Sequence, residues 1–383
     1  MTDTVMPRVL IADDQQDVLV ALQLLLKGEG ISTELATSPG AVLEKVASSS
    51  QRGQDYDVLL MDMNYARDTT SGREGLDLLS SIKALDQALP VVAMTAWASI
   101  DLAVEAMQRG LGDFVQKPWN NARLIHVLRE QLAVGKRKRA TRNEMIEARA
   151  IQQRLIPRES LQLKNFDFAC LWQPAREVSG DYCDVTPLND RYVSICIGDV
   201  SGKGLPAALL MSNLQAVVKA NEAAGMSPQQ LVTQVNHIIS QNVAANKFIT
   251  FFYGIVDTVE HRFTFTNAGH NAPLLLRKSG GVEFLREGGT ILGVLPDQEF
   301  TQTTVALEVG DRLLLYTDGI SEAVNAAGEE FGDQQLALIG QSYSDFRPTD
   351  LLREIHQAVT AFHQQEEQDD RTMIVMQVLP TGC

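Results

Sequence analysis

The chain has 383 residues, of which 45% are hydrophobic, so it is too long for one ordinary core and long enough for two globular domains. Its formal net charge of −15 argues against broad nucleic-acid binding, which depends on Lys and Arg side chains that neutralise phosphates. We find no signal sequence, no run of about 18 apolar residues and no CxxC spacing, and therefore expect a reduced, cytoplasmic protein without membrane contact.

Residues 1–133 alternate short apolar runs with amphipathic stretches. The apolar runs are typical of buried parallel strands, and they are Arg8–Ala12, Asp57–Met61, Pro90–Met94 and Asp113–Gln116. The stretches between them, such as Val18–Leu26 and Gly75–Leu85, are typical of helices. This alternation predicts a doubly wound α/β domain, in which ligands bind at the carboxyl ends of the strands.

Five polar side chains follow successive strands of this predicted sheet. Asp13 and Asp14 follow the first strand, Asp62 the third, Thr95 the fourth and Lys117 the last. An Asp pair suits Mg²⁺, and Asp62 can complete that site and also attack a phosphoryl group. Lys117 and Thr95 can neutralise and hydrogen-bond the phosphate oxygens. A lone Asp would be interpreted as a turn or cap residue, but this constellation at one sheet edge predicts phosphoryl chemistry.

The segments LIADDQ, LLMDMN, MTAWA and FVQKPW resemble the receiver domain of bacterial two-component response regulators, over roughly residues 7–133. The resemblance implies a flavodoxin-like sheet of five parallel strands. It also implies that a sensor histidine kinase phosphorylates Asp62. The Mg²⁺ ligands would be Asp13, Asp14, Asp62 and the carbonyl of Asn64.

Three further expectations concern the same domain. Phe114 matches the aromatic residue that changes rotamer on activation in the family. The Lys117–Pro118 bond is expected to be cis, a form nearly restricted to X–Pro bonds. The loop from Asp62 to Gly75 is longer than the usual receiver turn, and it is either a tolerated surface insertion or a determinant of kinase choice or phosphoryl lifetime.

The stretch from Asn120 to Ile156 is expected to be continuously helical, because no proline occurs in it. A basic cluster in this stretch, residues 136–139 with Arg142, is either a solvated face or a docking surface for an acidic partner. A three-and-four spacing follows, at Met145, Ala148, Gln152 and Leu155. The spacing predicts a short coiled coil and hence a homodimer, with a single helix packed on a neighbouring domain as the alternative.

From about Phe166 onward, strand-like runs dominate the sequence. They are Tyr192–Ile197, Thr250–Asp257, Arg262–Asn267, Pro273–Arg277, Arg312–Thr317 and Thr372–Val378. Helical regions interrupt them at Pro206–Ala224, Pro228–Ala244 and Asp350–Gln365. The pattern predicts an α+β domain with mostly antiparallel strands, in a sandwich of two sheets flanked by helices. We expect a helical linker over 134–157 and this second domain over 158–383.

A second group of acids lies at strand ends and turns of this domain. Its members are Asp181 in GDYCDV, Asp199 in GDVSGKG, Asp318 in YTDGIS, and Asp369 with Asp370 in DDRT. Carboxylates gathered in this way repel one another unless cations lie between them, and oxygen ligands select Mg²⁺ or Mn²⁺ over zinc. Two such ions can activate a water molecule and polarise a phosphate.

Two other polar residues of this domain receive a structural interpretation. His270, in AGHNAP, is interpreted as a hydrogen-bonded turn residue and not as a catalytic one. Lys203, in SGKG, lacks the full pattern of a phosphate-binding loop.

The segments AREVSGDYCDV, GDVSGKGLPAALLM, NAGHNAP, LYTDGISEAVNAAGEEFG and DDRT resemble the PPM family of metal-dependent Ser/Thr phosphatases, in its SpoIIE/RsbU branch. The resemblance implies two or more Mn²⁺ or Mg²⁺ ions. Asp199 would bridge both ions, the carbonyl of Val200 would hold the second, and Asp318 and Asp369 would hold the first. Asp181 would orient a metal-bound water or a further ion, with Asp370 as a neighbour. Arg176 would bind the phosphate or else form an ordinary surface ion pair.

The two resemblances together imply a protein phosphatase that is controlled by phosphorylation of Asp62. Its substrate would be a phosphorylated anti-sigma-factor antagonist. The alternative is a receiver-gated adaptor that binds a sigma-factor regulator without catalysis. The complete set of acids favours the enzyme.

Overall fold

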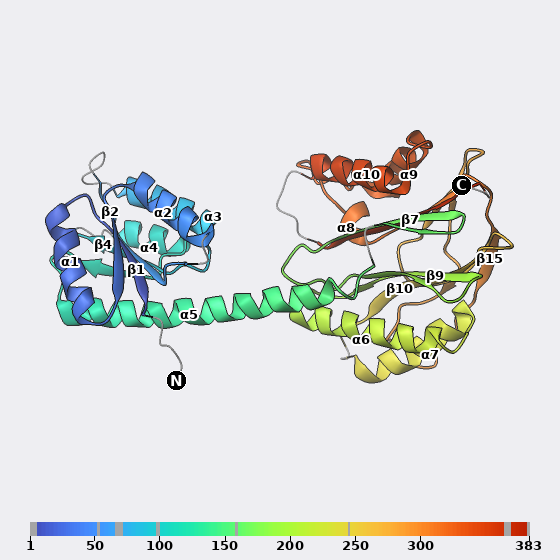
Figure 1. The fold of residues 1–383 in the computed structure, drawn as a ribbon, viewed down its shortest axis with the longest axis horizontal. Coiled ribbons are helices and arrows are strands. Elements are labelled where there is room, and N and C mark those ends of the chain that lie inside the picture. Colours follow the sequence, from blue (N-terminus) through green and yellow to red (C-terminus); the bar gives the residue numbers. More distant parts are fainter. Residues whose placement is uncertain are drawn as a thin grey trace. The chain divides into compact units, whose positions relative to one another are not determined.

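The computed structural model describes residues 6–51, 54–65, 72–96, 100–157, 160–243, 246–363 and 369–380, and Figure 1 draws it as a ribbon. The chain forms two compact units, Met1–Glu144 and Met145–Cys383, which we call the N-terminal unit and the C-terminal unit. Residues 66–71 of the predicted long loop lie outside the described part. Within the described residues, no helix combines the length and the apolar character that a bilayer crossing requires.

The N-terminal unit is the predicted doubly wound α/β fold, with a five-stranded parallel sheet in the order β2-β1-β3-β4-β5. Its strands are β1 (Arg8–Ala12), β2 (Ser32–Ala36), β3 (Val58–Asp62), β4 (Val91–Thr95) and β5 (Asp113–Gln116). Its helices are α1 (Gln16–Gly28), α2 (Pro39–Gln51), α3 (Arg73–Leu85), α4 (Ile100–Gln108) and the first part of α5 (Asn121–Gln152). The predicted fold class of this unit is therefore confirmed.

Both faces of this sheet are covered by helices. On one face, apolar side chains of α2, α3 and α4 pack against the sheet, and on the other face those of α1 and α5 do so. Because β1, β3 and β4 are buried on both faces, they read as continuous apolar runs in the sequence. The carboxyl ends of these strands then meet at one edge of the sheet.

Helix α5 ends at Gln152, four residues before the predicted end at Ile156. The side chain of Gln152 is 3% exposed and is hydrogen-bonded to Ser179 within the C-terminal unit. One of the four positions of the predicted coiled coil is therefore occupied inside its own chain, and the homodimer stays a prediction. The basic cluster is partly engaged as well, since Arg139 forms ion pairs with Asp57 at 3.3 Å and Asp86 at 3.7 Å.

The C-terminal unit is the predicted α+β sandwich. One six-stranded sheet has the order β14-β11-β10-β9-β8, with β15 paired to β11, and the other has the order β13-β12-β16-β17-β7-β6. The strands of the first sheet are β8 (Tyr182–Pro187), β9 (Tyr192–Val200), β10 (Ile249–Asp257), β11 (Arg262–Ala268), β14 (Gly288–Gly289) and β15 (Thr303–Ala306). Those of the second are β6 (Ser160–Leu163), β7 (Phe166–Gln173), β12 (Leu274–Leu276), β13 (Val282–Phe284), β16 (Arg312–Tyr316) and β17 (Arg371–Val378).

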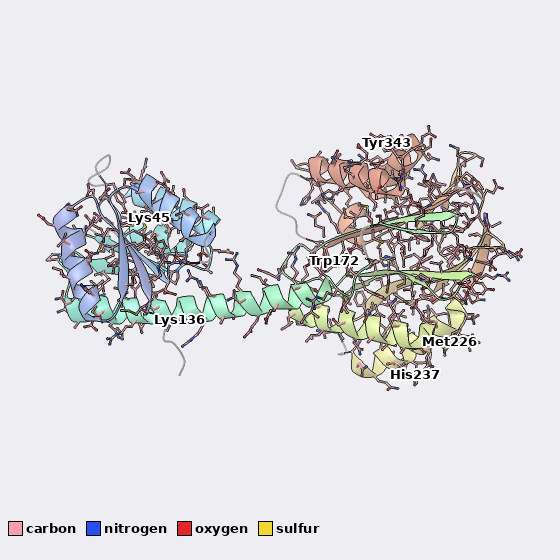
Figure 2. All side chains as sticks on the ribbon, viewed as in Figure 1. Lys45, Lys136, Trp172, Met226, His237 and Tyr343 are labelled. Atoms are coloured by element: carbon pink, nitrogen blue, oxygen red, sulfur yellow. The ribbon has the colours of Figure 1, made fainter. Side chains whose placement is uncertain are left out.

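The helices of this unit cover the outer faces of the two sheets. They are α6 (Leu205–Glu222), α7 (Pro228–Asn242), α8 (Asp318–Ser321), α9 (Gly332–Ser342) and α10 (Pro348–Phe362). Helices α6 and α7 pack on the first sheet, whereas α9 and α10 pack on the second. Figure 2 marks these two sides by Met226 and His237 on one and Tyr343 on the other. A third core of buried side chains fills the space between the sheets.

Candidate functional site

The acids of the N-terminal unit meet at the carboxyl edge of its sheet. Asp13 follows β1 directly, Asp14 comes next, and Asp62 is the last residue of β3. Carboxylate oxygens of these three residues all lie within 4.8 Å of one another. Asp13 and Asp62 are buried, whereas Asp14 is exposed, so the cluster opens to solvent on one side. Three hard oxygen donors with solvent access fit Mg²⁺, which commonly keeps several waters of its own.

Lys117 holds the two buried acids together. Its Nζ lies 2.6 Å from Oδ2 of Asp13 and 2.9 Å from Oδ2 of Asp62. Burial raises the pKa of Asp62, although the hydrogen bond and charge of Lys117 oppose that shift. Burial also acts to lower the pKa of Lys117, but its bonds to Asp13 and Asp62 outweigh burial and raise it. One ammonium therefore faces two carboxylates, so the charge of the buried acids is only partly balanced and a further cation would be attracted.

The other predicted residues of this site lie in or just after strands β3, β4 and β5. Thr95 is the buried last residue of β4, and its carbonyl accepts a hydrogen bond of 2.8 Å from the backbone N–H of Lys117. Oδ1 of Asn64 accepts from the N–H of Gly72 at 3.0 Å. Phe114 is partly buried against the core under α2, α3 and α4. The Lys117–Pro118 bond is cis, which confirms that prediction.

The acids of the C-terminal unit come from both sheets of the sandwich. Asp199 lies inside β9, opposite Thr250 of β10, and not beyond the strand as predicted, because pairing with β10 extends β9 to Val200. Asp181 is buried just before β8. Asp318 begins α8, two residues after the end of β16 in the other sheet. The two sheets thus deliver carboxylates to one end of the sandwich.

Electrostatics show that these carboxylates lack sufficient counter-charge. Burial raises the pKa of Asp199 to about 7, and the charge of Asp318 acts in the same direction. Burial raises the pKa of Asp318 to about 6, helped by the charge of Asp369. Burial and the charge of Asp199 raise the pKa of Asp181 well above its ordinary value. Acids destabilised by one another in this way fit divalent cations.

Asp369 and Asp370, just before β17, have different surroundings. Oδ1 of Asp370 accepts from the N–H of Ala175 at 2.8 Å, and Oδ2 accepts from Oγ of Ser179 at 2.6 Å and from the N–H of Gly180 at 2.9 Å. Asp370 therefore anchors the segment between β7 and β8. Asp369 instead forms an ion pair of 2.8 Å with Lys203, a contact that the sequence did not indicate.

Glycine is required at Gly319, where these acids approach α8. A Cβ atom there would overlap the carbonyl oxygen of Asp370, so the TDG turn brings Asp318 close to the DDRT segment. The five acids are nonetheless more widely spread than those of the N-terminal unit. Among the described residues, Asp13, Asp14 and Asp62 form the one group of His, Cys, Asp or Glu side chains close enough to meet the 4.8 Å limit.

Val200 and Arg176 complete the predicted set. Val200 is the buried last residue of β9, and its carbonyl faces Gly180, next to Asp181. Arg176 is exposed and follows Ala175, whose N–H is bonded to Asp370. Its guanidinium is therefore open to solvent, next in sequence to a residue that contacts Asp370.

His270 follows β11 and is hydrogen-bonded to two residues of the first sheet, as the interpretation of a hydrogen-bonded turn requires. Its Nδ1 lies 2.8 Å from Oγ1 of Thr250, the residue opposite Asp199. Its backbone N–H donates to Oδ1 of Asn267 at 2.7 Å. Nε2 has no hydrogen-bond partner, although the backbone of Tyr316 acts on the ring to raise its pKa. Burial outweighs that effect and lowers the pKa of His270 to about 4, so the ring is neutral near pH 7.

We expect His270 to make folding stability depend on pH. Its folded pKa lies below the value of about 6.5 in unfolded chains, so the unfolded state binds more protons and stability falls as the pH falls from 6.5 towards 4. Between pH 6.5 and 4.5 this residue should account for a loss of about 2 kcal/mol. Urea unfolding of wild type and His270→Gln at the two pH values measures it. Asp199 and Asp318 have raised pKa values and therefore stabilise the fold as the pH falls, which opposes the effect of His270. The test is therefore the difference in the pH dependence of unfolding free energy between wild type and His270→Gln. Equal pH dependence in the two proteins would contradict the prediction.

Comparison with known proteins identifies a family for each unit. The family model of the response regulator receiver domain matches residues 9–129, and that of Stage II sporulation protein E (SpoIIE) matches residues 189–379. The chain therefore belongs to the family of receiver proteins that carry a SpoIIE-type, PP2C-like phosphatase domain, as the two resemblances predicted.

Several individual proteins are similar to this chain. The chain is 30% identical over 237 residues to phosphoserine phosphatase RsbU of Bacillus subtilis, covering 61% of this chain and 70% of RsbU. It is 29% identical over 222 residues to protein IcfG of Synechocystis, covering 51% of this chain but 35% of IcfG. The structure of the RsbU and RsbW domains of Rv1364c from Mycobacterium tuberculosis matches at 25% identity with a TM-score of 0.53, covering 59% of this chain and 63% of that one.

Proposed function

We propose that the protein is a cytoplasmic protein Ser/Thr phosphatase whose activity is set by phosphorylation of Asp62. The observation that carries the proposal is the presence of two complete acid sets in one chain, each with the surroundings that phosphate chemistry needs. One set is paired with the fixed ammonium of Lys117. In the other set, burial and neighbouring carboxylates raise the pKa values of Asp181, Asp199 and Asp318. Arg176 lies in the segment that Asp370 anchors through the N–H of Ala175.

At the N-terminal unit, Asp62 would accept a phosphoryl group from a sensor histidine kinase. A carboxylate oxygen of Asp62 forms the new bond to phosphorus as the bond from phosphorus to the histidine nitrogen of the kinase breaks. Lys117, 2.9 Å from Oδ2 of Asp62, is placed to pair with an oxygen of the transferred group. Mg²⁺ held by Asp13, Asp14, Asp62 and the carbonyl of Asn64 would neutralise the added charge.

At the C-terminal unit, water would attack the phosphorus of a phosphoserine or phosphothreonine, and the bond from phosphorus to the side-chain oxygen would break. Two Mn²⁺ or Mg²⁺ ions, when bound by Asp199, Asp318, Asp369 and the carbonyl of Val200, would supply positive charge and an activated water. Asp181, held by Oγ1 of Thr317 at 2.9 Å, would orient that water or a further ion. The guanidinium of Arg176 would bind the phosphate.

The name of one relative supports a substrate class. RsbU is named a phosphoserine phosphatase, and the region of this chain that matches the SpoIIE family model contains four of the five acids, Asp199, Asp318, Asp369 and Asp370. We therefore propose that the substrate is a small phosphorylated protein of the anti-sigma-factor antagonist class.

The test is hydrolysis of p-nitrophenyl phosphate and of a phosphoserine protein, with Mn²⁺ or with chelator, and with or without beryllofluoride. We expect turnover that requires the metal, since the acids alone repel both phosphate and one another. We also expect the rate to change when beryllofluoride occupies Asp62. Stoichiometric capture of a partner without metal-dependent phosphate release would instead support the adaptor.

A further inference from the structure

The last residue of α5 contacts the segment that carries Asp181, one of the acids of the C-terminal unit. Nε2 of Gln152 donates to the carbonyl of Ser179 at 2.9 Å, and the N–H of Ser179 donates to Oε1 of Gln152 at 3.1 Å. Both residues are buried, with exposed fractions of 3% and 0%. The amide of Gln152 thus forms a pair of hydrogen bonds to one backbone unit, which fixes that unit in position and orientation.

Ser179 passes this constraint to two acids. Its Oγ donates to Oδ2 of Asp370 at 2.6 Å and accepts from the N–H of Asp181 at 3.0 Å. The N–H of Gly180 also donates to Oδ2 of Asp370. One residue therefore lies between the end of α5 and two acids beside the proposed ligand set, Asp181 and Asp370. Asp181 is itself held on the other side by Thr317, the residue before Asp318.

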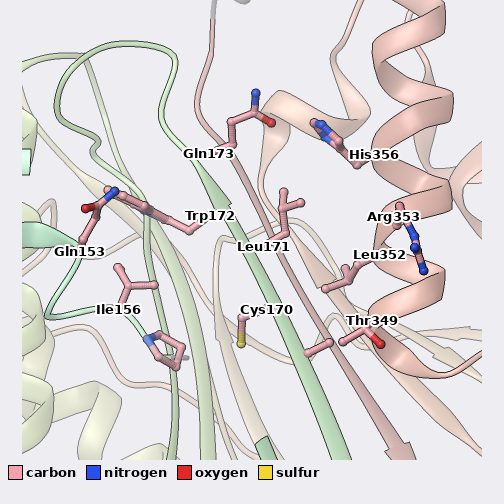
Figure 3. A pocket seen from close by; sticks show the side chains of 12 residues that line it. Gln153, Ile156, Cys170, Leu171, Trp172, Gln173, Thr349, Leu352, Arg353 and His356 are labelled. Carbon is pink, nitrogen blue, oxygen red and sulfur yellow. The ribbon is translucent and has the colours of Figure 1, made fainter. Parts of the chain in front are cut away.

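The segment after Gln152 borders a cavity of about 490 Å³, which leaves it space to shift. Figure 3 shows Gln153 and Ile156 beside Trp172 of β7, opposite Arg353 and His356 of α10. Gln153 is exposed and borders the cavity, whereas Ile156 packs against two of the buried cores of the unit. The end of α5 is thus bonded to Ser179, and the cavity begins at the next residue, Gln153.

We propose that Gln152 is a positioning residue for the phosphatase: through Ser179 it fixes Asp181 and Asp370, so that the position of the end of α5 sets the metal affinity of the acids. The inference rests on the proposed function and adds a site of regulation to it. Hydrogen bonds to groups that orient metal ligands commonly change affinity or activity by about 10- to 100-fold when they are removed.

The first test replaces Gln152 by Ala and by Met in the full chain, with Gln153→Ala as the control. Gln153 is the same residue type at the next position, but it is exposed. In the metal-free protein we expect amide hydrogen exchange over residues 174–181 to be about 10-fold faster in both Gln152 variants and unchanged in the control. Met keeps the volume of Gln without its hydrogen bonds, so recovery in Gln152→Met would show a packing role and overturn the proposal.

The second test measures Mn²⁺ affinity by titration of the wild type and of the same variants. We expect a loss of about 10-fold or more for both Gln152 variants and none for Gln153→Ala. Ser179→Ala keeps the backbone bonds to Gln152 but removes the hydroxyl that contacts Asp370 and Asp181. Because both changes interrupt one chain of hydrogen bonds, Gln152→Ala with Ser179→Ala should lose less affinity than the product of the single losses.

The outcomes separate this inference from the proposed function. Additive effects, or unchanged exchange and affinity in Gln152→Ala, would overturn the positioning role while metal-dependent turnover by the wild type leaves the phosphatase intact. Absence of metal-dependent turnover in the wild type would refute the proposed function itself, whereas the exchange measurement on the metal-free protein would still report on the contacts of Gln152.

Discussion

Asp318→Ala should abolish phosphatase turnover, with a loss of more than about 100-fold in kcat/KM, the upper range seen for residues that only orient metal ligands. Asp318 begins α8, two residues after the end of β16, and its pKa is raised by burial and by the charge of Asp369, another member of the proposed ligand set. Its removal would delete a ligand from the second sheet, so that the ions supplied by solution could no longer be held between the sheets. Steady-state hydrolysis of a phosphoserine protein in saturating Mn²⁺ measures the loss.

The matched control for this variant is Asp345→Ala. Asp345 belongs to the same unit, but its side chain is 89% exposed and pairs only at the surface with Lys278 among the described residues. It should retain wild-type turnover. Unfolding midpoints of both variants distinguish a lost ligand from a lost fold. Turnover within a few-fold of wild type in a folded Asp318→Ala protein would contradict the proposed ligand set.

Asp62→Ala should remove the response to phosphorylation and leave basal phosphatase turnover in place. Asp62 is the proposed phosphoryl acceptor, and it lies with Lys117 in the N-terminal unit. The acids proposed to act in hydrolysis all lie in the C-terminal unit. The variant has no carboxylate to form the acyl phosphate, so beryllofluoride or a small acyl-phosphate donor should change its rate by less than about twofold. Hydrolysis rates with and without the donor measure the effect.

An exposed acid in the same unit serves as the control for Asp62. Asp77, on α3, has a side chain that is 83% exposed, and Asp77→Ala should respond to the donor as the wild type does. The division of labour between the units would be wrong if folded Asp62→Ala lost its basal turnover as completely as Asp318→Ala.

Much of the fold followed from local patterns. Residues of β3 and β4 are buried on both faces, so their apolar runs indicated parallel strands, and Asp62 and Thr95 then had to lie at one sheet edge. Strand β2 was not identified, because its sequence STELA is mostly polar and only partly buried at the edge of the sheet. Strand β7 was not identified either, because Asp167 interrupts its apolar pattern. Asp167 forms an ion pair of 3.3 Å with Arg347, which is distant in sequence.

The site itself was predictable only as a set of residue types. Glycine turns and acids indicated where carboxylates would gather, but the distinct surroundings of Asp369 and Asp370 depend on contacts with Lys203 and Ala175. The bond between Gln152 and Ser179 joins two residues that are distant in sequence and ordinary in type. Such contacts depend on how whole helices and strands pack, so residue spacing in the sequence does not predict them.

The pair formed by Lys203 and Asp369 has a consequence for how the enzyme would respond to its surroundings. An ammonium tethered 2.8 Å from the carboxylate is present at a high effective concentration whatever the solution contains. On the proposed ligand set, an incoming ion must displace this resident cation before the site is complete. This competition would raise the concentration of free metal at which the site is half occupied, so that occupancy would depend on the ion supply of the cell.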